Sequence, residues 1–389
     1  MKILMIAPEP IFQPRGTPLS VVGRLKALSD MGHQVDLLTY SMGQTVNLPG
    51  IHFLRIPAIP GIKKIKIGPS LTKIPLDLCL MLKTFRQLMR KRYDLIHTHE
   101  EAGFWGIVAS LIFRIPHIYD MHSSLPQQLR NFQFTQSRIL ITLFQYLERW
   151  VLKTASAVIT ICPDLQNHVL SLLPGKQSVL IENVIDYGTI FGQVDRSGQI
   201  REHYHLKGKK VVLYAGTFEP YQGIDLLIQS AVSVVGRNPK VIFMAVGGHA
   251  DQVNYYQHKV NRAGLQSSFV FTGQVLPQEV NSYVQCADVL VSPRKSGTNT
   301  PLKIYSYLRS GLPIVATRLW THTQVLDDGV AILVDAAPDA LAGGIEAALK
   351  PSVERNRMII AAGRLAEEKY SVQVYKKKFA NVLELALRG

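Results

Sequence analysis

The chain has 389 residues, a length that is enough for two domains with full cores. Its composition, with 47% hydrophobic and 18% charged residues, excludes a disordered or fibrous protein. A formal net charge of +15 at pH 7 favours an anionic partner, and residues 1–180 hold 20 Lys and Arg against 10 Asp and Glu. No apolar run reaches the roughly 18 residues of a membrane-spanning helix. The start MKILMIAPEP is typical of a first β-strand rather than a signal peptide, so we expect a cytoplasmic protein.

Strands and helices are expected to alternate along the first half of the chain. Lys2–Ala7 predicts a strand, residues 12–18 a loop, residues 19–31 a helix that ends at Gly32, and residues 34–40 the next strand. This order opens a doubly wound α/β domain. The later elements expected are a basic amphipathic helix at 72–92, strands at 94–98 and 117–120, a long helix at 137–154 and a strand at Ala157–Thr160.

A second alternating series begins at Lys209. The segments VVLYAGT, KVIFMAVGG, SFVFTG and DVLVSP predict strands with helices between them, and a polar segment that contains DRSGQ separates the two series. We therefore expect a Rossmann-like domain over residues 1–185, a linker over 186–208 and a second Rossmann-like domain over 209–365. A C-terminal helix over 366–389 is expected to pack back toward the first domain.

The segment 292–317, SPRKSGTNTPLKIYSYLRSGLPIVAT, combines the end of a buried strand, a polar loop and the start of a helix. We expect Pro301 at the first helical position, where a missing N–H is tolerated, and a helix from Leu302 to Ser310. A small-residue loop before a helix presents free backbone N–H groups, and the helix dipole adds to their attraction for a phosphate. The alternative is an ordinary βαβ unit with nothing bound.

Several motifs together resemble the retaining, family-four type of nucleotide-sugar glycosyltransferases over nearly the whole chain. The matching segments are PRGTP with Gly16, MGHQVDLLT, DLIHTH, IYDMH with His122, ERWVLKTASAVITIC, ENVID and YAGTFEPYQGIDLL. The resemblance implies an α/β protein with the GT-B fold, in which two Rossmann-like domains face a central cleft. It also implies transfer of a hexose from a UDP or GDP sugar to a lipid-linked or glycan acceptor, without a cofactor.

Four positions depart from the family pattern at the donor site. The usual Arg and Lys that hold the donor diphosphate are matched by Thr217 and Gln222, and the two usual glutamates by Thr298 and Ser306. We expect Lys303, Arg294 or Lys295 to supply the missing positive charge, with a solvated loop charge as the alternative for Arg294 and Lys295. The resemblance also implies Gly16, Gly248 and Val275 on the donor side, and the polar loop before the predicted helix adds Asn299, Thr300, Pro301 and Leu302. Glu219 is expected either to meet a sugar hydroxyl or to cap the following turn. If the departures abolish donor contacts, the alternative function is a noncatalytic GT-B partner subunit.

His122 follows a predicted strand, at the edge of the sheet where α/β proteins bind ligands. We expect it, with Thr298 and Lys303, to be catalytic through a contact with a sugar hydroxyl or the leaving group, although a lone histidine is more often structural. His99 and Glu101 follow the neighbouring strand and are expected on the acceptor side. Neither the spacing of these residues nor the three scattered cysteines supports a metal site.

Residues 59–73 predict a strip that contacts anionic lipid head groups, because Lys63, Lys64, Lys66 and Lys73 alternate with isoleucines. Arg86, Arg90, Lys91 and Arg92 extend the strip, which would place the protein at the inner face of the membrane. A solvated basic face is the alternative. No RNA- or DNA-binding module accompanies the charge, so a nucleic acid is not an expected partner.

Overall fold

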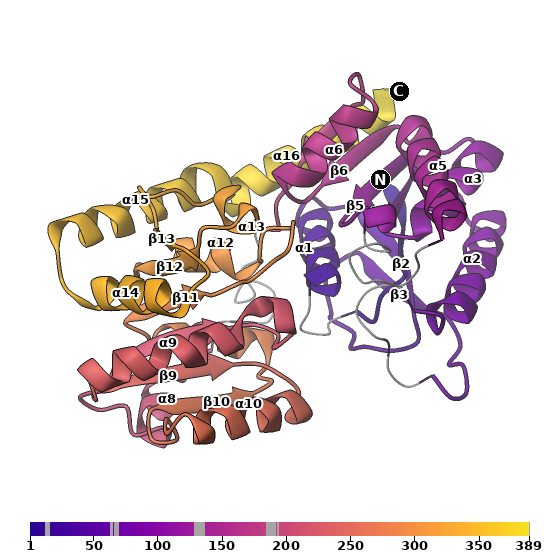
Figure 1. The fold of residues 1–389 in the computed structure, drawn as a ribbon. Helices are drawn as coiled ribbons and strands as arrows, with labels where there is room; N and C mark the ends of the chain where they lie inside the picture. Colours follow the sequence, from indigo (N-terminus) through magenta and orange to yellow (C-terminus); the bar gives the residue numbers. More distant parts are fainter. Residues whose placement is uncertain are drawn as a thin grey trace. The chain divides into compact units, whose positions relative to one another are not determined.

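The computed structural model describes residues 1–11, 16–62, 65, 70–127, 137–183, 192 and 194–388 (Figure 1). The chain divides into two compact units. Unit 1 comprises Met1–Asn183 and Val372–Gly389, and unit 2 comprises Val184–Ser371. Each unit contains one parallel β-sheet with helices between its strands, so the predicted α/β class with two Rossmann-like domains is confirmed.

The sheet of unit 1 has the strand order β3-β2-β1-β4-β5-β6-β7, and all of its pairs are parallel. Its strands β4 and β5 are buried at every position, as expected for the centre of a parallel sheet. The strands are β1 (Lys2–Ala7), β2 (Gln34–Thr39), β3 (Ile51–Arg55), β4 (Leu95–His99), β5 (His117–Met121), β6 (Ala157–Thr160) and β7 (Ser178–Leu180).

The described helices of unit 1 are α1 (Gly16–Asp30), α2 (Lys73–Arg90), α3 (Ala102–Phe113), α5 (Arg138–Thr154), α6 (Pro163–Leu172) and α16 (Val372–Arg388). The prediction was wrong at the start of α1, which begins at Gly16 and not at residue 19. Pro18 lies in the first turn, where a backbone N–H has no helical partner and proline is tolerated. Ser137 caps α5, because its Oγ accepts a hydrogen bond from the Leu140 N–H at 3.4 Å.

The sheet of unit 2 has the strand order β10-β9-β8-β11-β12-β13 and is also parallel. Its strands are β8 (Lys210–Ala215), β9 (Val241–Val246), β10 (Phe269–Gly273), β11 (Val289–Ser292), β12 (Ile314–Thr317) and β13 (Ile332–Val334). Its helices are α8 (Ser197–His203), α9 (Ile224–Arg237), α10 (Ala250–Arg262), α11 (Val280–Val284), α12 (Lys303–Leu308), α13 (Trp320–Thr323), α14 (Pro338–Leu349) and α15 (Val353–Tyr370).

Both sheets have a point at which the strand order reverses direction. In unit 1 it lies between β1 and β4, and in unit 2 between β8 and β11. At such a point the connections from the two adjacent strands run to opposite faces of the sheet, and α/β proteins bind ligands outside the carboxyl ends of these strands. The residues that follow these four strands are therefore the first to consider as a site.

The predicted helix 366–389 is divided between the two units. Residues 366–370 complete α15 of unit 2, and α16 begins at Val372 and packs on β5, β6 and β7 of unit 1. The predicted linker 186–208 lies partly outside the described residues, and its described part includes α8, which belongs to unit 2. Among the helices described, none combines the length and the apolarity that spanning a membrane requires.

Candidate functional site

The loops that follow β8 and β11 meet at the strand-order reversal of unit 2. The Lys295 N–H donates to the carbonyl oxygen of Tyr221 at 2.9 Å, which ties one loop to the other. Gly223 lies against the Pro293 carbonyl, and a Cβ at Gly223 would be 1.8 Å from that oxygen. Because the φ of Gly223 is also +79°, this close approach requires glycine.

Arg294, directly after β11, is held by neutral groups. Its Nη1 donates to the carbonyl oxygen of Asn299 and to Thr321 Oγ1, both at 2.9 Å, and its Nε donates to Gln222 Oε1 at 3.4 Å. Its guanidinium carbon lies 5.4 Å from the centre of the Tyr221 ring. Burial lowers the pKa of Arg294, and no carboxylate among the described residues forms an ion pair with it.

Lys303, at the start of α12, is the second cation beside these loops. Its Nζ is buried 3.5 Å from the centre of the Tyr214 ring and close to Gly216, and it has no hydrogen-bond partner among the described residues. Burial, with a smaller contribution from the charge of Arg294, lowers the pKa of Lys303 well below its usual value. A buried ammonium with neither a hydrogen bond nor a counter-ion is costly, so this position favours an anionic ligand.

The structure corrects the prediction for the start of α12. The helix begins at Lys303 and ends at Leu308, so Pro301 is not its first residue. Instead, Pro301 and Leu302 lie in a turn, and their carbonyl oxygens accept from the Ile304 and Tyr305 N–H groups at 3.0 and 3.3 Å. Such a short helix has little dipole to offer, and the two cations carry the attraction for an anion.

The other donor-side residues on this loop differ in exposure. Thr298 and Ser306 are exposed, and the Ser306 hydroxyl donates to the carbonyl oxygen of Lys303 at 2.8 Å. The carbonyl oxygen of Asn299 accepts from Arg294. Thr300 is buried, and its Oγ1 has no hydrogen-bond partner in the described part of the chain.

The predicted donor-side residues outside this loop occupy four other places, after β8, β9 and β10 and at the start of α1. Thr217 and Gln222 bond to each other weakly, with Gln222 Nε2 3.5 Å from Thr217 Oγ1. Glu219 accepts from Gln252 Nε2 of α10 at 3.2 Å. Gly248 packs on Phe218, Val275 is half-buried after β10, and Gly16 is the exposed first residue of α1 in unit 1.

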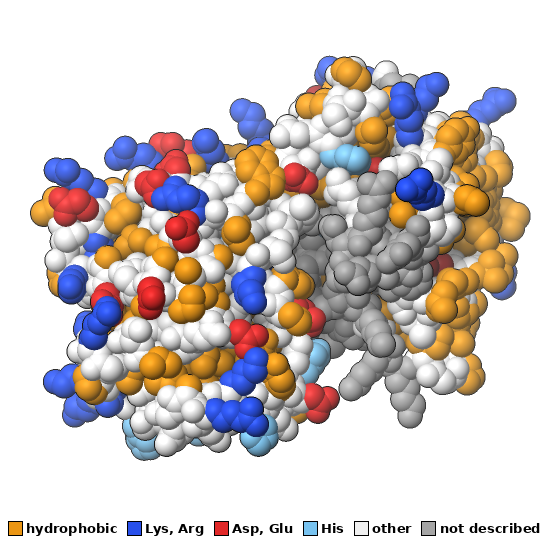
Figure 2. All heavy atoms as spheres, viewed as in Figure 1, with side chains coloured by type: hydrophobic (Ala, Val, Ile, Leu, Met, Phe, Trp, Pro, Cys, Tyr) orange, Lys and Arg blue, Asp and Glu red, His pale blue; other side chains and the backbone are white. Residues whose placement is uncertain are grey.

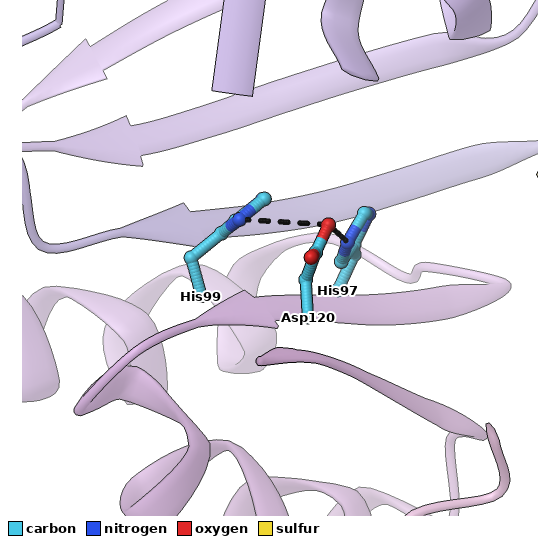
Figure 3. A group of neighbouring side chains, drawn as sticks. All are labelled: His97, His99 and Asp120. Carbon is cyan, nitrogen blue, oxygen red and sulfur yellow. Dashed lines mark hydrogen bonds and ion pairs between the residues drawn. The ribbon is translucent and has the colours of Figure 1, made fainter. Parts of the chain in front are cut away.

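A buried polar network occupies the centre of unit 1 (Figure 3). His97 and His99 of β4 and Asp120 of β5 lie side by side, with Asp120 Oδ2 3.3 Å from His97 Nε2 and 3.7 Å from His99 Nδ1. The neighbouring His122 has its Nε2 3.0 Å from His99 Nδ1 and 3.3 Å from Asp120 Oδ1. His122 is therefore a buried member of the network.

Arg24 of α1 neutralises the charge of Asp120 in this network. Its Nε donates to Asp120 Oδ2 at 2.8 Å, its Nη1 to the Tyr375 hydroxyl at 2.7 Å and its Nη2 to the Ile181 carbonyl at 3.1 Å. Burial opposes ionisation of Asp120, but Arg24 and the histidines outweigh it and hold the pKa of Asp120 well below its usual value. Burial lowers the pKa of His122 to about 4 and that of His99 well below 6.5, so both rings are neutral at pH 7.

The ligand atoms of His97, His99 and Asp120 lie within 4.8 Å of one another, a spacing that a metal ion could bridge. The donor set does not fit a cation, however, because the Arg24 guanidinium already occupies Asp120 Oδ2, the oxygen that faces both histidines. A metal there would meet a fixed positive charge at short range. The arrangement fits a neutral histidine network oriented by an ion pair.

A carboxylate cluster lies at the strand-order reversal of unit 1, formed by Glu9 after β1, Glu100 and Glu101 after β4, and Lys73 and Asp77 of α2. Lys73 Nζ lies 2.9 Å from Glu101 Oε1 and 3.8 Å from Glu9 Oε1.

Lys73 is thus buried among carboxylates, and its predicted contact with lipid is wrong; Lys63, Lys64 and Lys66 lie outside the described residues. Burial raises the pKa of Glu100 to about 8 and that of Asp77 to about 7.

The structure thus separates the two predicted acceptor-side residues, because His99 belongs to the histidine network and Glu101 to the carboxylate cluster. The sequence interpretation missed Glu9, Asp77 and Arg24. Glu9 could have been found, because it follows β1 as Glu100 follows β4, and the two strands are adjacent. Nothing in the sequence marks Arg24 as buried or Asp77 as half-buried.

Two family descriptions match consecutive parts of the chain. Residues 16–188 match Glycosyltransferase Family 4, and residues 209–351 match Glycosyl transferases group 1. The phosphatidyl-myo-inositol mannosyltransferase of Mycobacterium tuberculosis is 27% identical over 398 residues, which cover 99% of this chain and 97% of that protein. The D-inositol 3-phosphate glycosyltransferase of Kribbella flavida is 23% identical over 356 residues, or 84% of this chain and 81% of that protein.

Solved structures with similar folds cover the whole length as well. Anabaena HepE in complex with UDP has a TM-score of 0.76 at 18% identity, and the match covers 99% of this chain and 100% of HepE. Sucrose-phosphate synthase from Thermosynechococcus elongatus has a TM-score of 0.74 at 18% identity, with 98% of both chains covered. These likenesses confirm the GT-B fold class.

Proposed function

The chain belongs to the group 1, family 4 glycosyltransferases and is a transferase enzyme, and from this premise we propose that it moves a hexose, with retention of configuration, from a nucleotide-diphosphate sugar to a membrane-associated or glycan acceptor. One observation carries the proposal. The strand-order reversal of unit 2 has two cations beside it, Arg294 and Lys303, that have no carboxylate partner among the described residues.

A nucleoside diphosphate supplies the negative charge that these two cations lack. Its phosphate oxygens accept hydrogen bonds from Lys303 and Arg294, and such charge-assisted bonds are stronger than neutral ones. The hydroxyl of Thr300 and backbone N–H groups near Asn299 and Leu302 are further donors for the same anion. Thr217 and Gln222 then line the site without having to carry the charge, which accounts for their neutrality. HepE is described in complex with UDP, which supports a nucleoside diphosphate as the ligand of this site.

In a retaining transfer of this type, the leaving diphosphate assists its own departure and takes the proton of the acceptor hydroxyl, so the protein mainly positions groups and stabilises charge. We propose that Lys303 stabilises the diphosphate and that Thr298 adjoins the sugar. His122 is proposed to contact a sugar hydroxyl or the leaving group. Asp120 and His99, which hold its Nε2, then fix the orientation of its ring.

The carboxylate cluster supports a polyhydroxylated acceptor. Carboxylate oxygens accept hydrogen bonds from hydroxyl groups, and Glu101 Oε2 is a buried atom without a partner among the described residues. The relatives are named for phosphatidyl-myo-inositol and D-inositol 3-phosphate. We therefore propose that a lipid-linked or glycan acceptor presents its hydroxyls to Glu9, Glu100 and Glu101.

Calorimetric titration with UDP and GDP tests the donor site. Lys303→Met removes one charged contact to a partly desolvated phosphate, which costs about 1.5–3 kcal/mol, or roughly ten- to a hundredfold in affinity. Lys295, exposed on the same loop, provides the matched control, and Lys295→Met should change affinity less than about twofold. No binding of either nucleotide to the wild-type protein at millimolar concentration, or equal losses in the two variants, would overturn the proposal.

A further inference from the structure

We infer that unit 1 docks on membranes of anionic lipid through the outer faces of α2, α3 and α5, whose apolar side chains enter the head-group boundary. The inference deepens the proposed function and rests on it in one respect, because it names the surface on which the enzyme would meet a membrane-associated acceptor.

Three neighbouring helices expose apolar side chains where a globular protein usually has polar ones. Helix α3 contacts both α2 and α5. Ten of the eighteen exposed large hydrophobic side chains in the described residues lie on or beside these helices: Leu71, Ile74, Leu78, Leu82 and Met89 for α2, Leu111 and Ile112 for α3, and Ile139, Leu143 and Tyr146 for α5. Figure 2 shows hydrophobic side chains along the edge of unit 1 where Figure 1 labels α2, α3 and α5.

The spacing of these residues makes each set a continuous stripe. On α2, Ile74, Leu78 and Leu82 are four residues apart, and on α5 Ile139, Leu143 and Tyr146 are four and three residues apart; residues at these intervals share one face of a helix. Leu71 lies two residues before α2 begins and is also exposed. These side chains are largely exposed to solvent, for example Ile139 at 85% and Met89 at 71%. An apolar face that crosses three helices marks an interaction surface, whereas scattered exposed leucines do not.

The charges of the same helices select an anionic partner. Their exposed charged side chains are all basic: Arg86 and Arg90 on α2, and Arg138, Arg149 and Lys153 on α5. Both acidic residues of these helices are withdrawn, since Asp77 accepts from the Tyr40 hydroxyl and Glu148 accepts from His168 Nε2 at 2.8 Å. Helix α3 has no charged residue. Apolar stripes flanked only by cations are typical of helices that lie in the interface of an anionic membrane.

This surface differs from the lysine strip that the sequence predicts. Lys73 is buried and paired with Glu101 and Glu9, whereas the nearby side chains of Leu71 and Ile74 are exposed. Contact through apolar side chains and arginines has a different response to salt from contact through lysines alone. Salt screens the charge attraction, with a Debye length of about 3 Å at 1 M, but it does not weaken the burial of apolar surface.

Flotation with vesicles tests the surface directly. The wild-type protein should float with vesicles of phosphatidylglycerol and phosphatidylcholine in equal parts and far less with phosphatidylcholine alone. Leu78→Gln with Leu82→Gln, and separately Ile139→Gln with Leu143→Gln, should lower the partition coefficient about tenfold or more at low salt, and the remaining wild-type binding at 1 M NaCl should vanish in both. Arg86→Gln with Arg90→Gln should lower binding at low salt only.

The matched control is the pair Val353→Gln and Ile360→Gln, which removes two exposed apolar side chains of α15 in unit 2 and should leave flotation unchanged. Thermal melting of each variant confirms that it is folded, which exposed Gln should not prevent. UDP and GDP titrations of the same variants separate the two proposals: intact nucleotide binding without flotation of the wild type overturns the docking surface alone. Sedimentation that shows a wild-type dimer lost in the α2 and α5 variants, without flotation, would assign the face to a second copy of the chain and overturn the inference.

Discussion

Arg24 shows how one buried side chain organises a polar centre. Its guanidinium joins Asp120 of β5, the Ile181 carbonyl after β7 and the Tyr375 hydroxyl of α16, three segments that are distant in sequence. Because the ion pair is fully buried, both charges are removed from water, and each depends on the other for compensation. The rings of Tyr375 and Phe379 also flank the guanidinium at 5.2 and 5.8 Å.

Arg24→Met should therefore destabilise unit 1 strongly. It leaves the charge of Asp120 buried without a counter-ion, which costs roughly 3–5 kcal/mol in the free energy of unfolding. Urea-induced unfolding measures this loss. Adding Asp120→Asn to Arg24→Met should restore part of the stability, because the uncompensated charge is then removed.

The control for this comparison is the exposed pair of Arg237 and Glu346, which bond at 2.8 and 2.9 Å. Arg237→Met should cost less than about 1 kcal/mol, because exposed ion pairs are weak. A loss for Arg24→Met as small as that for Arg237→Met would contradict the account of the buried pair.

The positions of functional side chains could be predicted from the sequence only at the ends of predicted strands. Polar residues after buried strands predict that His99, Glu101 and His122 lie at one edge of a sheet, and the structure places them there. Arg24 and Lys73 could not be predicted, because basic residues on helices usually face solvent, and only the strands folded beside them supply Asp120 and Glu101 as partners.

At the scale of elements, the loops of unit 2 approach one another more closely than side chains allow. Gly247 and Gly248 follow β9 with φ values of +124° and +80°. A Cβ on Gly247 would lie 2.0 Å from the Gly216 carbonyl oxygen, and one on Gly248 would lie 2.3 Å from the Phe218 ring. These glycines let the loops after β8 and β9 lie together beside the two cations.

Gly248→Ala should destabilise unit 2 and weaken nucleotide binding together. The left-handed backbone alone costs an alanine about 1–2 kcal/mol, and the contact with the buried Phe218 ring adds to it. Gly236→Ala in α9 is the control, because a Cβ there meets nothing within 4 Å and helix propensity favours alanine by up to about 1 kcal/mol. Thermal melting should move in opposite directions for the two variants, and equal shifts would contradict this role for Gly248.

Most elements follow from periodicity and turn residues, and the exceptions have local causes. Hydrophobic patterns in the sequence predicted the bounds of β4, β5, β6 and α5 to within a residue or two of those in the structure. The error at α12 came from treating Pro301 as the start of a helix, whereas its carbonyl closes a turn that precedes one. The error at α1 came from treating Pro18 as loop, although the first turn of a helix accepts proline.

At the scale of the whole molecule, the buried titratable groups predict two opposite dependences on pH. Burial lowers the pKa of His117 and His322 to about 3 and that of His122 to about 4. Below pH 6.5 the unfolded chain binds protons that these folded residues do not, so stability falls as the pH falls from about 6.5 toward 4. The slope is about 1.4 kcal/mol per pH unit for each histidine.

Glu100 and Asp77 act in the other direction, because burial raises their pKa values to about 8 and about 7. The folded protein keeps protons that the unfolded carboxyl groups release, so stability falls as the pH rises from about 4 to 8. In unit 1 burial also lowers the pKa values of His97 and His99, so below pH 6.5 four histidines, with His117 and His122, outweigh Glu100 and Asp77. Above pH 6.5 the effect of the two carboxyl groups dominates. Unit 1, which contains both kinds of group, should therefore be most stable near pH 6.5.

Urea unfolding between pH 4.5 and pH 8.5 measures this optimum. Asp77→Asn with Glu100→Gln should flatten the decline above pH 6.5 and leave the decline below it. Stability of unit 1 that keeps rising to pH 8.5 in the wild type would show that the two carboxyl groups are ionised in the folded protein.

The passage of the chain between the units has a consequence for biosynthesis. Unit 2 is continuous in sequence, from Val184 to Ser371, whereas α16 of unit 1 is synthesised only after all of unit 2. While the ribosome is making unit 2, the surface of β5, β6 and β7 lacks the helix that covers it, and Arg24 lacks Tyr375. The nascent chain can therefore complete unit 2 before unit 1. Until Val372–Gly389 leaves the exit tunnel, the rest of unit 1 must avoid aggregation and keep the surface that α16 covers free for that helix.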